Sequence, residues 1–184
     1  MPATLVSKEA STLVRALVLY AAAEAQAGHA KHVVVTASGD RFTVADDGRG
    51  HSIDKVVDET PYLSYIYEHF KFPFDGAPAG QVQLQGIGMS LVNRLCRELR
   101  VTVRRANSQL ELVFQAGALV SKRQTASTMT GSGTEVSGTA DRADGATQAE
   151  GDTLRTWLHS LAAGLPGVRI SYNGQLLGPD QATD

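Results

Sequence analysis

Residues 42–50 read FTVADDGRG, an apolar and β-branched run that ends in a polar, glycine-rich turn. The run predicts a strand, and the turn begins at its last residue, Asp46. Upstream, HVVVT (32–36) is a second run of this kind, and a short segment containing Gly39 separates the two. Together they predict a β-hairpin. A carboxylate at the end of its second strand could accept a hydrogen bond from a ligand amine, or simply form an Asx turn or a helix N-cap.

Helical patterns lie on both sides of this hairpin. Residues 7–28 carry apolar side chains at three- and four-residue steps and predict a helix that ends at Gly28. Residues 53–70 predict a helix broken by Pro61, and residues 71–85 lack periodicity and predict a loop. From residue 86 to about 99, an apolar stripe that includes Cys96 predicts a further helix with the cysteine in the core.

The second half of the chain is richer in strands. RVTVRR (100–105) and QLELVFQ (109–115) predict a hairpin, and residues 118–140 predict one or two more strands. Residues 153–163 predict a helix, and residues 168–177 a short closing hairpin. This order predicts a single domain of the α+β class, with a mixed, mostly antiparallel sheet and helices on one face.

The composition excludes several classes of protein. Seventeen Lys and Arg against nineteen Asp and Glu give a net charge of −2, which provides no bulk attraction to nucleic acid or an anionic membrane. The single cysteine, the lack of an apolar N-terminal run and the short apolar stretch at 13–23 predict a cytoplasmic protein with no membrane span. The five histidines show no metal-ligand spacing with Cys96, so no zinc site is predicted.

Three further features have two interpretations each. Residues 85–90, QGIGMS, could hold a phosphate through backbone N–H groups before a helix, or form an ordinary tight turn. Arginines between 94 and 105 could face DNA, but a solvated helix end and strand is the favoured interpretation. Aromatic residues gathered at 62–74 could form a partner surface, with core packing favoured.

FTVADDGRG (42–50) followed by LQGIGMSLVNRLC (84–96) resembles the adenine-binding strand and the phosphate loop of one family of ATPase domains. These are the ATPase domains of DNA gyrase B and topoisomerase IV, which have the GHKL, or Bergerat, fold. EAQAG (24–28), residues 131–134 and residues 154–174 resemble further segments, so the resemblance covers nearly the whole chain. It implies a two-layer α/β sandwich over residues 1–184, without the transducer and DNA-cleavage domains.

The resemblance also implies roles for individual residues. Asp46 would bind the adenine amine, Thr134 would share the contact beneath the base, and Gly50 would leave room for the base. Arg49 and Arg105 would flank the pocket, Gln85 to Gly88 would hold phosphates, and Lys71 would belong to a lid. The implied nucleotide-binding residues are Asp46, Gly48, Arg49, Gly50, Lys71, Gln85, Gly86, Ile87, Gly88, Arg105 and Thr134.

The chain departs from this family on its first predicted helix. The family carries there a general-base Glu and, four residues later, an Asn that binds Mg²⁺, both on one helix face. Counting back from EAQAG places Ala16 and Tyr20 at these positions. His51-Ser52 and Gln83 also differ from the usual residues of the family. These departures predict no catalytic base and no metal ligand, so in-line hydrolysis of a nucleotide would be lost.

Three hypotheses of function follow. The first is a pseudo-ATPase that binds ATP or ADP weakly and without Mg²⁺, and acts as a regulatory or partner-binding protein. The second is an active ATPase domain of a type II DNA topoisomerase in which another residue replaces the base. The third is a protein-binding scaffold that takes no nucleotide. The first hypothesis includes a protein partner, no direct DNA contact, and a monomer or weak dimer.

Overall fold

The computed structural model describes residues 4–57, 59–68, 88–127, 130–141 and 145–178. Its helices are α1 (Lys8–Gln26), α2 (Tyr62–Glu68), α3 (Met89–Arg94) and α4 (Gln148–Ala163). Its main strands are β1 (His32–Ser38), β2 (Arg41–Asp46), β5 (Cys96–Arg105), β6 (Ser108–Gln115), β7 (Ala118–Ala126), β8 (Gly133–Ala140), β9 (Arg169–Tyr172) and β10 (Gln175–Leu177). A separate two-stranded ribbon consists of β3 (Val56–Val57) and β4 (Thr60–Pro61).

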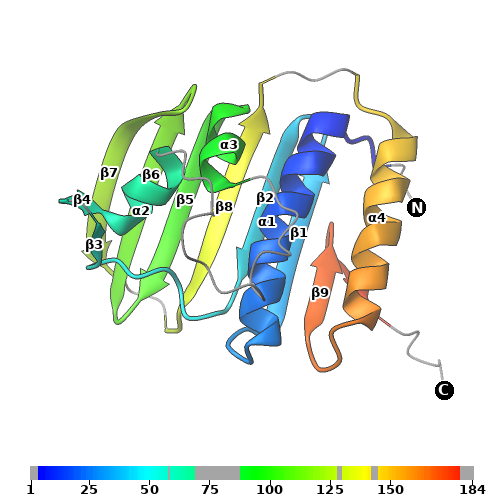
Figure 1. Cartoon of the computed structure of the whole chain (residues 1–184). Helices are drawn as coiled ribbons and strands as arrows, with labels where there is room; N and C mark the ends of the chain where they lie inside the picture. Colours follow the sequence, from blue (N-terminus) through cyan, green and yellow to red (C-terminus); the bar gives the residue numbers. More distant parts are fainter. Residues whose placement is uncertain (1–3, 58, 69–87, 128–129, 142–144, 179–184) are drawn as a thin grey trace, which may run out of the picture.

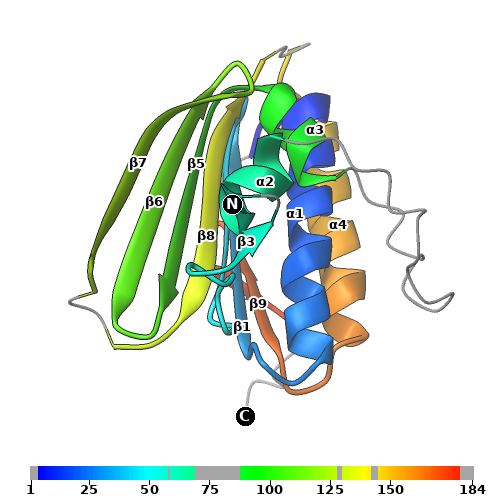
Figure 2. The ribbon, with the colours of Figure 1, turned by 60° about the vertical axis from the view of Figure 1, so that its left-hand side comes forward.

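The eight main strands form one sheet in the order β10-β9-β1-β2-β8-β5-β6-β7. Within the described residues every neighbouring pair is antiparallel except β1 and β9, which run parallel. The helices all lie on one face of this sheet, with α1 over its centre (Figures 1 and 2). The predicted α+β class and two-layer arrangement are therefore confirmed. No described helix is long and apolar enough to cross a membrane.

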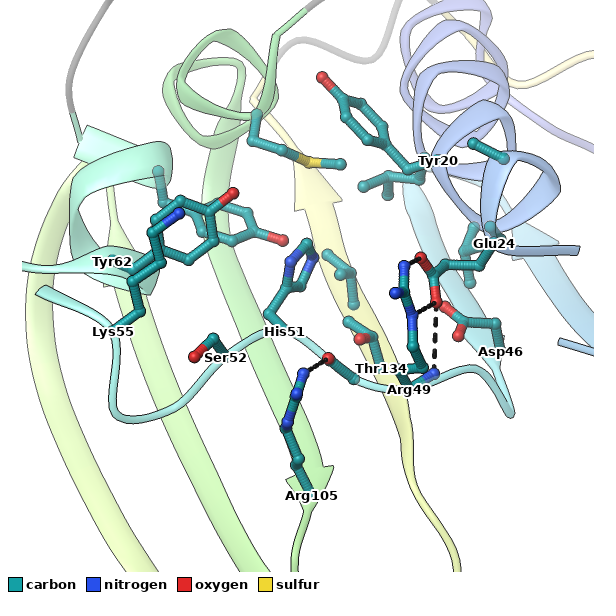
Figure 3. A pocket seen from close by; sticks show the side chains of 18 residues that line it. Tyr20, Glu24, Asp46, Arg49, His51, Ser52, Lys55, Tyr62, Arg105 and Thr134 are labelled. Atoms are coloured by element: carbon teal, nitrogen blue, oxygen red, sulfur yellow. Dashed lines mark hydrogen bonds and ion pairs between the residues drawn. The ribbon is translucent and has the colours of Figure 1, made fainter. Parts of the chain in front are cut away.

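Helix α1 packs against β1 and β2 and leads into the region of the Asp46 turn. Ser7 caps its N-terminus by accepting a hydrogen bond from the backbone N–H of Ala10 at 3.2 Å. One face of the helix, including Leu13, Leu17 and Val18, is buried in the core. Tyr20 and Glu24 lie at the edge of this face, near the end of β2. The C-terminal half of α1 therefore places polar side chains beside the turn (Figure 3).

The structure differs from the predicted helices in two places. The helix predicted over 86–99 ends at Arg94, and Cys96 already begins β5, because pairing with β6 and β8 on both sides outweighs the local helical pattern. The helix predicted over 53–70 begins only at Tyr62. Pro61 closes the β3–β4 ribbon there, at a position where its missing N–H costs no helical hydrogen bond.

Cys96 lies in the core, as predicted, and is 1% exposed. Burial raises the pKa of its thiol to about 12, and the nearby Asp141 carboxylate adds to the effect. Only the thiolate reacts with disulfide reagents, so we expect modification at pH 8 to be roughly 10³-fold slower than for a free cysteine. Ellman's reagent should release no colour within minutes from the native protein and one equivalent in denaturant. Fast release from the native protein would contradict the buried position.

Candidate functional site

A pocket of about 500 Å³ opens beside the end of β2, a volume typical of sites for small molecules. Figure 3 shows its walls, which come from α1, from the segment that follows β2, from α2 and from the sheet. Its lining residues are Leu17, Tyr20, Ala21, Ala23, Glu24, Val44, Asp46, Arg49, Gly50, His51, Ser52, Lys55, Tyr62, Tyr67, Met89, Arg105, Thr134 and Val136.

Asp46 is the last residue of β2 and faces this pocket. Its Oδ1 accepts a hydrogen bond from the backbone N–H of Gly48 at 2.9 Å. Strand pairing places Thr134 of β8 directly opposite Asp46, so a carboxylate and a hydroxyl lie side by side on the pocket wall. Burial raises the pKa of Asp46 from 3.8 to about 6, and the nearby Glu24 carboxylate adds to this rise. The carboxyl is therefore charged at neutral pH, and its second oxygen is not engaged by the Gly48 bond.

An ion pair holds the turn after β2 against α1. Arg49 donates from Nη2 to Glu24 Oε1 at 2.7 Å and from Nε to Oε2 at 3.2 Å. The hydrogen bond from Arg49 lowers the pKa of Glu24, so this carboxylate stays charged. Figure 3 shows the pair beside Asp46 at the pocket wall. The role of Glu24 was not predicted, although it lies four residues after Tyr20 and so shares its helix face.

Glycine is required in the turn itself. Gly50 has φ of +70°, and a Cβ there would lie 2.6 Å from the backbone oxygen of Arg104. A Cβ on Gly48 would meet the Asp46 carboxylate at 2.7 Å. Two contacts from the sheet side fix the turn: Ser132 Oγ donates to the Gly48 carbonyl at 2.6 Å, and Arg105 donates to the Gly50 carbonyl at 3.0 Å.

The structure brings most of the predicted residues that it describes to one place. Asp46, Arg49, Gly50, Arg105 and Thr134 line the pocket, and Gly48 supplies the N–H bound by Asp46. Gly88 caps α3 and is not among the described lining residues. Four predicted residues lie outside the described part of the chain, namely Lys71, Gln85, Gly86 and Ile87.

Tyr20, at the position implied for the metal ligand, lines the pocket from α1. Burial raises the pKa of its hydroxyl above 10, so it is a neutral phenol. Ala16, one turn earlier, is 4% exposed in the core and is not among the described lining residues. At the two positions implied for the base and the metal ligand, the chain therefore carries a methyl group and a phenol, not a carboxylate and an amide.

The side of the pocket opposite Asp46 is aromatic, which the sequence did not indicate. The rings of His51 and Tyr62 lie 6.4 Å apart, and the Lys55 ammonium lies 4.6 Å from the centre of the Tyr62 ring. Burial lowers the pKa of His51, so the imidazole is neutral at pH 7. A neutral imidazole and phenol rings are better suited to contact a flat, uncharged ligand group than a charged one.

The chain is similar in sequence to several curated proteins, two of which illustrate the match. It is 34% identical over 116 residues to the B subunit of DNA topoisomerase 4 of Salmonella typhimurium, covering 57% of this chain and 18% of that protein. It is 32% identical over 167 residues to the DNA gyrase B subunit of Streptococcus pyogenes serotype M3, covering 86% of this chain and 25% of that protein. The chain thus spans a quarter or less of the length of these relatives. No model of a known protein family matches it.

A solved structure agrees with these relatives. The 43K ATPase domain of Thermus thermophilus gyrase B, in complex with an aminocoumarin, superposes with a TM-score of 0.70 at 23% identity, covering 89% of this chain and 44% of that one. The fold is therefore that of the GHKL ATPase domains. With the sequence matches, the chain is a homologue of the ATPase domains found in the B subunits of gyrase and topoisomerase IV.

Proposed function

We propose that the pocket binds the adenine of ATP or ADP, and that the protein is a nucleotide-binding module that does not hydrolyse its ligand. The observation that carries the proposal is the charged Asp46 carboxylate at the end of β2, beside Thr134 in a pocket of about 500 Å³. The 6-amino group of adenine donates hydrogen bonds, and the Asp46 oxygen that does not bind Gly48 can accept one. The homology to ATPase domains supports the same ligand.

The absence of hydrolysis rests on the carboxylates that line the pocket. Within the described residues these are Asp46, which holds the Gly48 N–H, and Glu24, which holds Arg49 through both oxygens. A general base needs an unoccupied lone pair directed at the attacking water. The second oxygen of Asp46 is the proposed acceptor for the adenine amine, and Arg49 holds both oxygens of Glu24, so neither carboxylate is available to activate a water.

The family also implies a bound Mg²⁺, which these residues do not fit. Mg²⁺ requires oxygen ligands in near-octahedral geometry, with carboxylates preferred among protein groups. Tyr20 presents a neutral phenol, and the Glu24 carboxylate is paired with Arg49. Within the described residues no group of three His, Cys, Asp or Glu side chains could hold a metal. Nucleotide binding is accordingly expected to be independent of Mg²⁺.

The test is a calorimetric titration with ADP and with a non-hydrolysable ATP analogue, each with and without Mg²⁺. We expect binding whose affinity changes less than about twofold on adding the metal, and no phosphate release from ATP above the buffer blank. Mg²⁺-dependent turnover that scales with protein concentration would instead support an active topoisomerase-type ATPase domain. No binding at millimolar ligand would support the protein-binding scaffold.

A nucleotide-binding module that does not hydrolyse its ligand can act only by changing its contacts with another protein when the nucleotide binds. We propose a cytoplasmic protein, a monomer or weak dimer, that uses the nucleotide to regulate a protein partner. Size measurement with and without ADP, at several protein concentrations, tests the proposed oligomeric state.

A further inference from the structure

Tyr67 of α2 carries a hydroxyl that has no hydrogen-bond partner among the described residues. The residue is 1% exposed and its side chain lines the pocket. The hydroxyl oxygen is buried, and no described atom bonds it. An unpartnered buried hydroxyl costs free energy that a phenylalanine at the same place would not. Such a group in a pocket wall suggests that a ligand provides the missing partner.

The ring of Tyr67 is held in place without help from the hydroxyl. It stacks on Phe114 with centroids 5.5 Å apart and an angle of 29°. Asn93 donates from Nδ2 to the Tyr67 carbonyl at 3.1 Å and to the Gly117 carbonyl at 3.0 Å, which ties α2 to α3 and to the turn before β7. Packing therefore accounts for the position of the ring but provides no hydrogen-bond partner for the hydroxyl.

The surroundings of Tyr67 indicate which part of a ligand it would meet. Burial raises the pKa of its hydroxyl, and Tyr20 and Asp46 both add to the rise, so the phenol lies within electrostatic reach of the two. Tyr67 belongs to α2, which forms the wall of the pocket across from Asp46 (Figure 3). Asp46 is the proposed acceptor for the 6-amino group of adenine, and N9, which carries the sugar of a nucleoside, lies at the other end of the purine. The wall across from Asp46 therefore meets the sugar.

The cations of the pocket support an uncharged contact at this place. Among the described lining residues, Arg49 is paired with Glu24, Arg105 donates to the Gly50 carbonyl, and Lys55 lies over the Tyr62 ring. None of these contacts places a positive charge on Tyr67. Its neutral hydroxyl is suited to a ribose hydroxyl or ring oxygen.

We propose that Tyr67 is a ligand-binding residue whose hydroxyl forms a hydrogen bond with the ribose of an adenine nucleoside or nucleotide. This inference rests on the proposed function, because it takes Asp46 as the site of the base. Water barely reaches the hydroxyl, so neighbouring lining side chains shift as the sugar enters. The bond distinguishes adenosine and ADP, which carry the sugar, from free adenine, which does not.

The experiment compares Tyr67→Phe with the wild-type protein by calorimetric titration of adenine, adenosine and ADP. The variant should bind adenosine and ADP about 3- to 10-fold more weakly, by the same factor for both, and adenine unchanged. Its melting temperature without ligand should rise by about 2–4 °C, because the substitution removes a buried group without a partner. A residue that only supports the structure would not lower affinity while raising stability.

Tyr172→Phe is the matched control. The Tyr172 hydroxyl is also buried without a described partner, but its ring packs beside Arg155 of α4 and does not line the pocket. This variant should show the rise in melting temperature with unchanged affinity for all three ligands. Unchanged affinity in Tyr67→Phe would overturn the inference, as would a loss confined to ADP, which would place the contact on a phosphate.

Asp46→Asn separates the inference from the proposed function. If wild type binds adenosine and Asp46→Asn does not, the adenine site stands whatever Tyr67→Phe shows. If wild type binds none of the three ligands at millimolar concentration, the proposed function fails and the ribose contact fails with it.

Discussion

Asp46→Asn is expected to weaken the binding of ADP by about 100-fold, since it replaces a charged acceptor by an amide in the pocket wall. In the variant the amide oxygen should accept the hydrogen bond that the Gly48 N–H now donates to Oδ1 at 2.9 Å. The amide N–H₂ then faces the adenine amine, so two donors meet without an acceptor. Calorimetric titration measures the loss. Asp54→Asn is the control, because it removes an equal charge from an exposed position outside the pocket lining and should leave affinity unchanged.

The same substitution should make the folded protein more stable at pH 7. A pKa of Asp46 raised from 3.8 to about 6 means that the folded state binds a proton more tightly than the unfolded state. The cost of charging this buried carboxyl is absent below pH 3.8 and complete above pH 6, at up to about 3 kcal/mol. Asparagine carries no such cost. The melting temperature of Asp46→Asn should therefore exceed that of the wild-type protein at pH 7, and the difference should disappear near pH 4. A less stable variant at pH 7 would contradict the buried charge.

Affinity should depend on pH through the same group. Protonation of Asp46 removes the charged acceptor, so wild-type affinity for ADP should fall as the pH drops through 6. His51 and Glu24 also line the pocket and titrate in the acidic range, so the pH profile of Asp46→Asn is measured beside it. A profile as steep in the variant as in wild type would assign the dependence to those groups.

Gly133→Ala is expected to cost about 3–5 kcal/mol of stability, roughly a 6–15 °C drop in melting temperature. Gly133 begins β8 with φ of +152°, and a Cβ there would lie 2.2 Å from the backbone oxygen of Asp46. Since backbone cannot yield as a side chain can, β2 and β8 must separate where they form the pocket wall. Thermal unfolding measures the loss, and ADP affinity should fall with it.

Gly131→Ala supplies the matched control for that change. Its φ of +108° is also unfavourable for alanine, but a Cβ there meets nothing within 4 Å. It should cost only the backbone strain, about 1–2 kcal/mol, and leave ADP affinity unaltered. Equal losses in the two variants would show that the contact with Asp46 has no effect of its own.

The strand and turn around Asp46 could be predicted because their signal is local. The alternation of apolar residues ends where the glycines begin, and pairing with β8 then adds Thr134. The end of α3 could not be predicted in this way, since Cys96 and Leu99 fit a helical stripe and a strand equally well. Only the pairing of β5 on both sides decides between them.

The aromatic side of the pocket could not be predicted from the sequence for a different reason. His51, Tyr62 and Tyr67 come from a loop and a short helix whose spacing has no regular period. Tyr67 is buried, as core packing predicts for this aromatic segment, but the pattern cannot tell a core face from a pocket wall. Glu24 likewise reads as an ordinary polar helix position until the fold brings Arg49 to it.

The order of strands in the sheet also governs how the protein is made. β1 and β2 are synthesised before the strands that pair with them. β8, which pairs with β2, and β9, which pairs with β1, are made far later. Until then Asp46 has no Thr134 opposite it, and both sides of the central hairpin remain unpaired edges. The nascent chain therefore cannot form its pocket until β8 has been synthesised, and until then β1 and β2 are able to pair with strands of other chains.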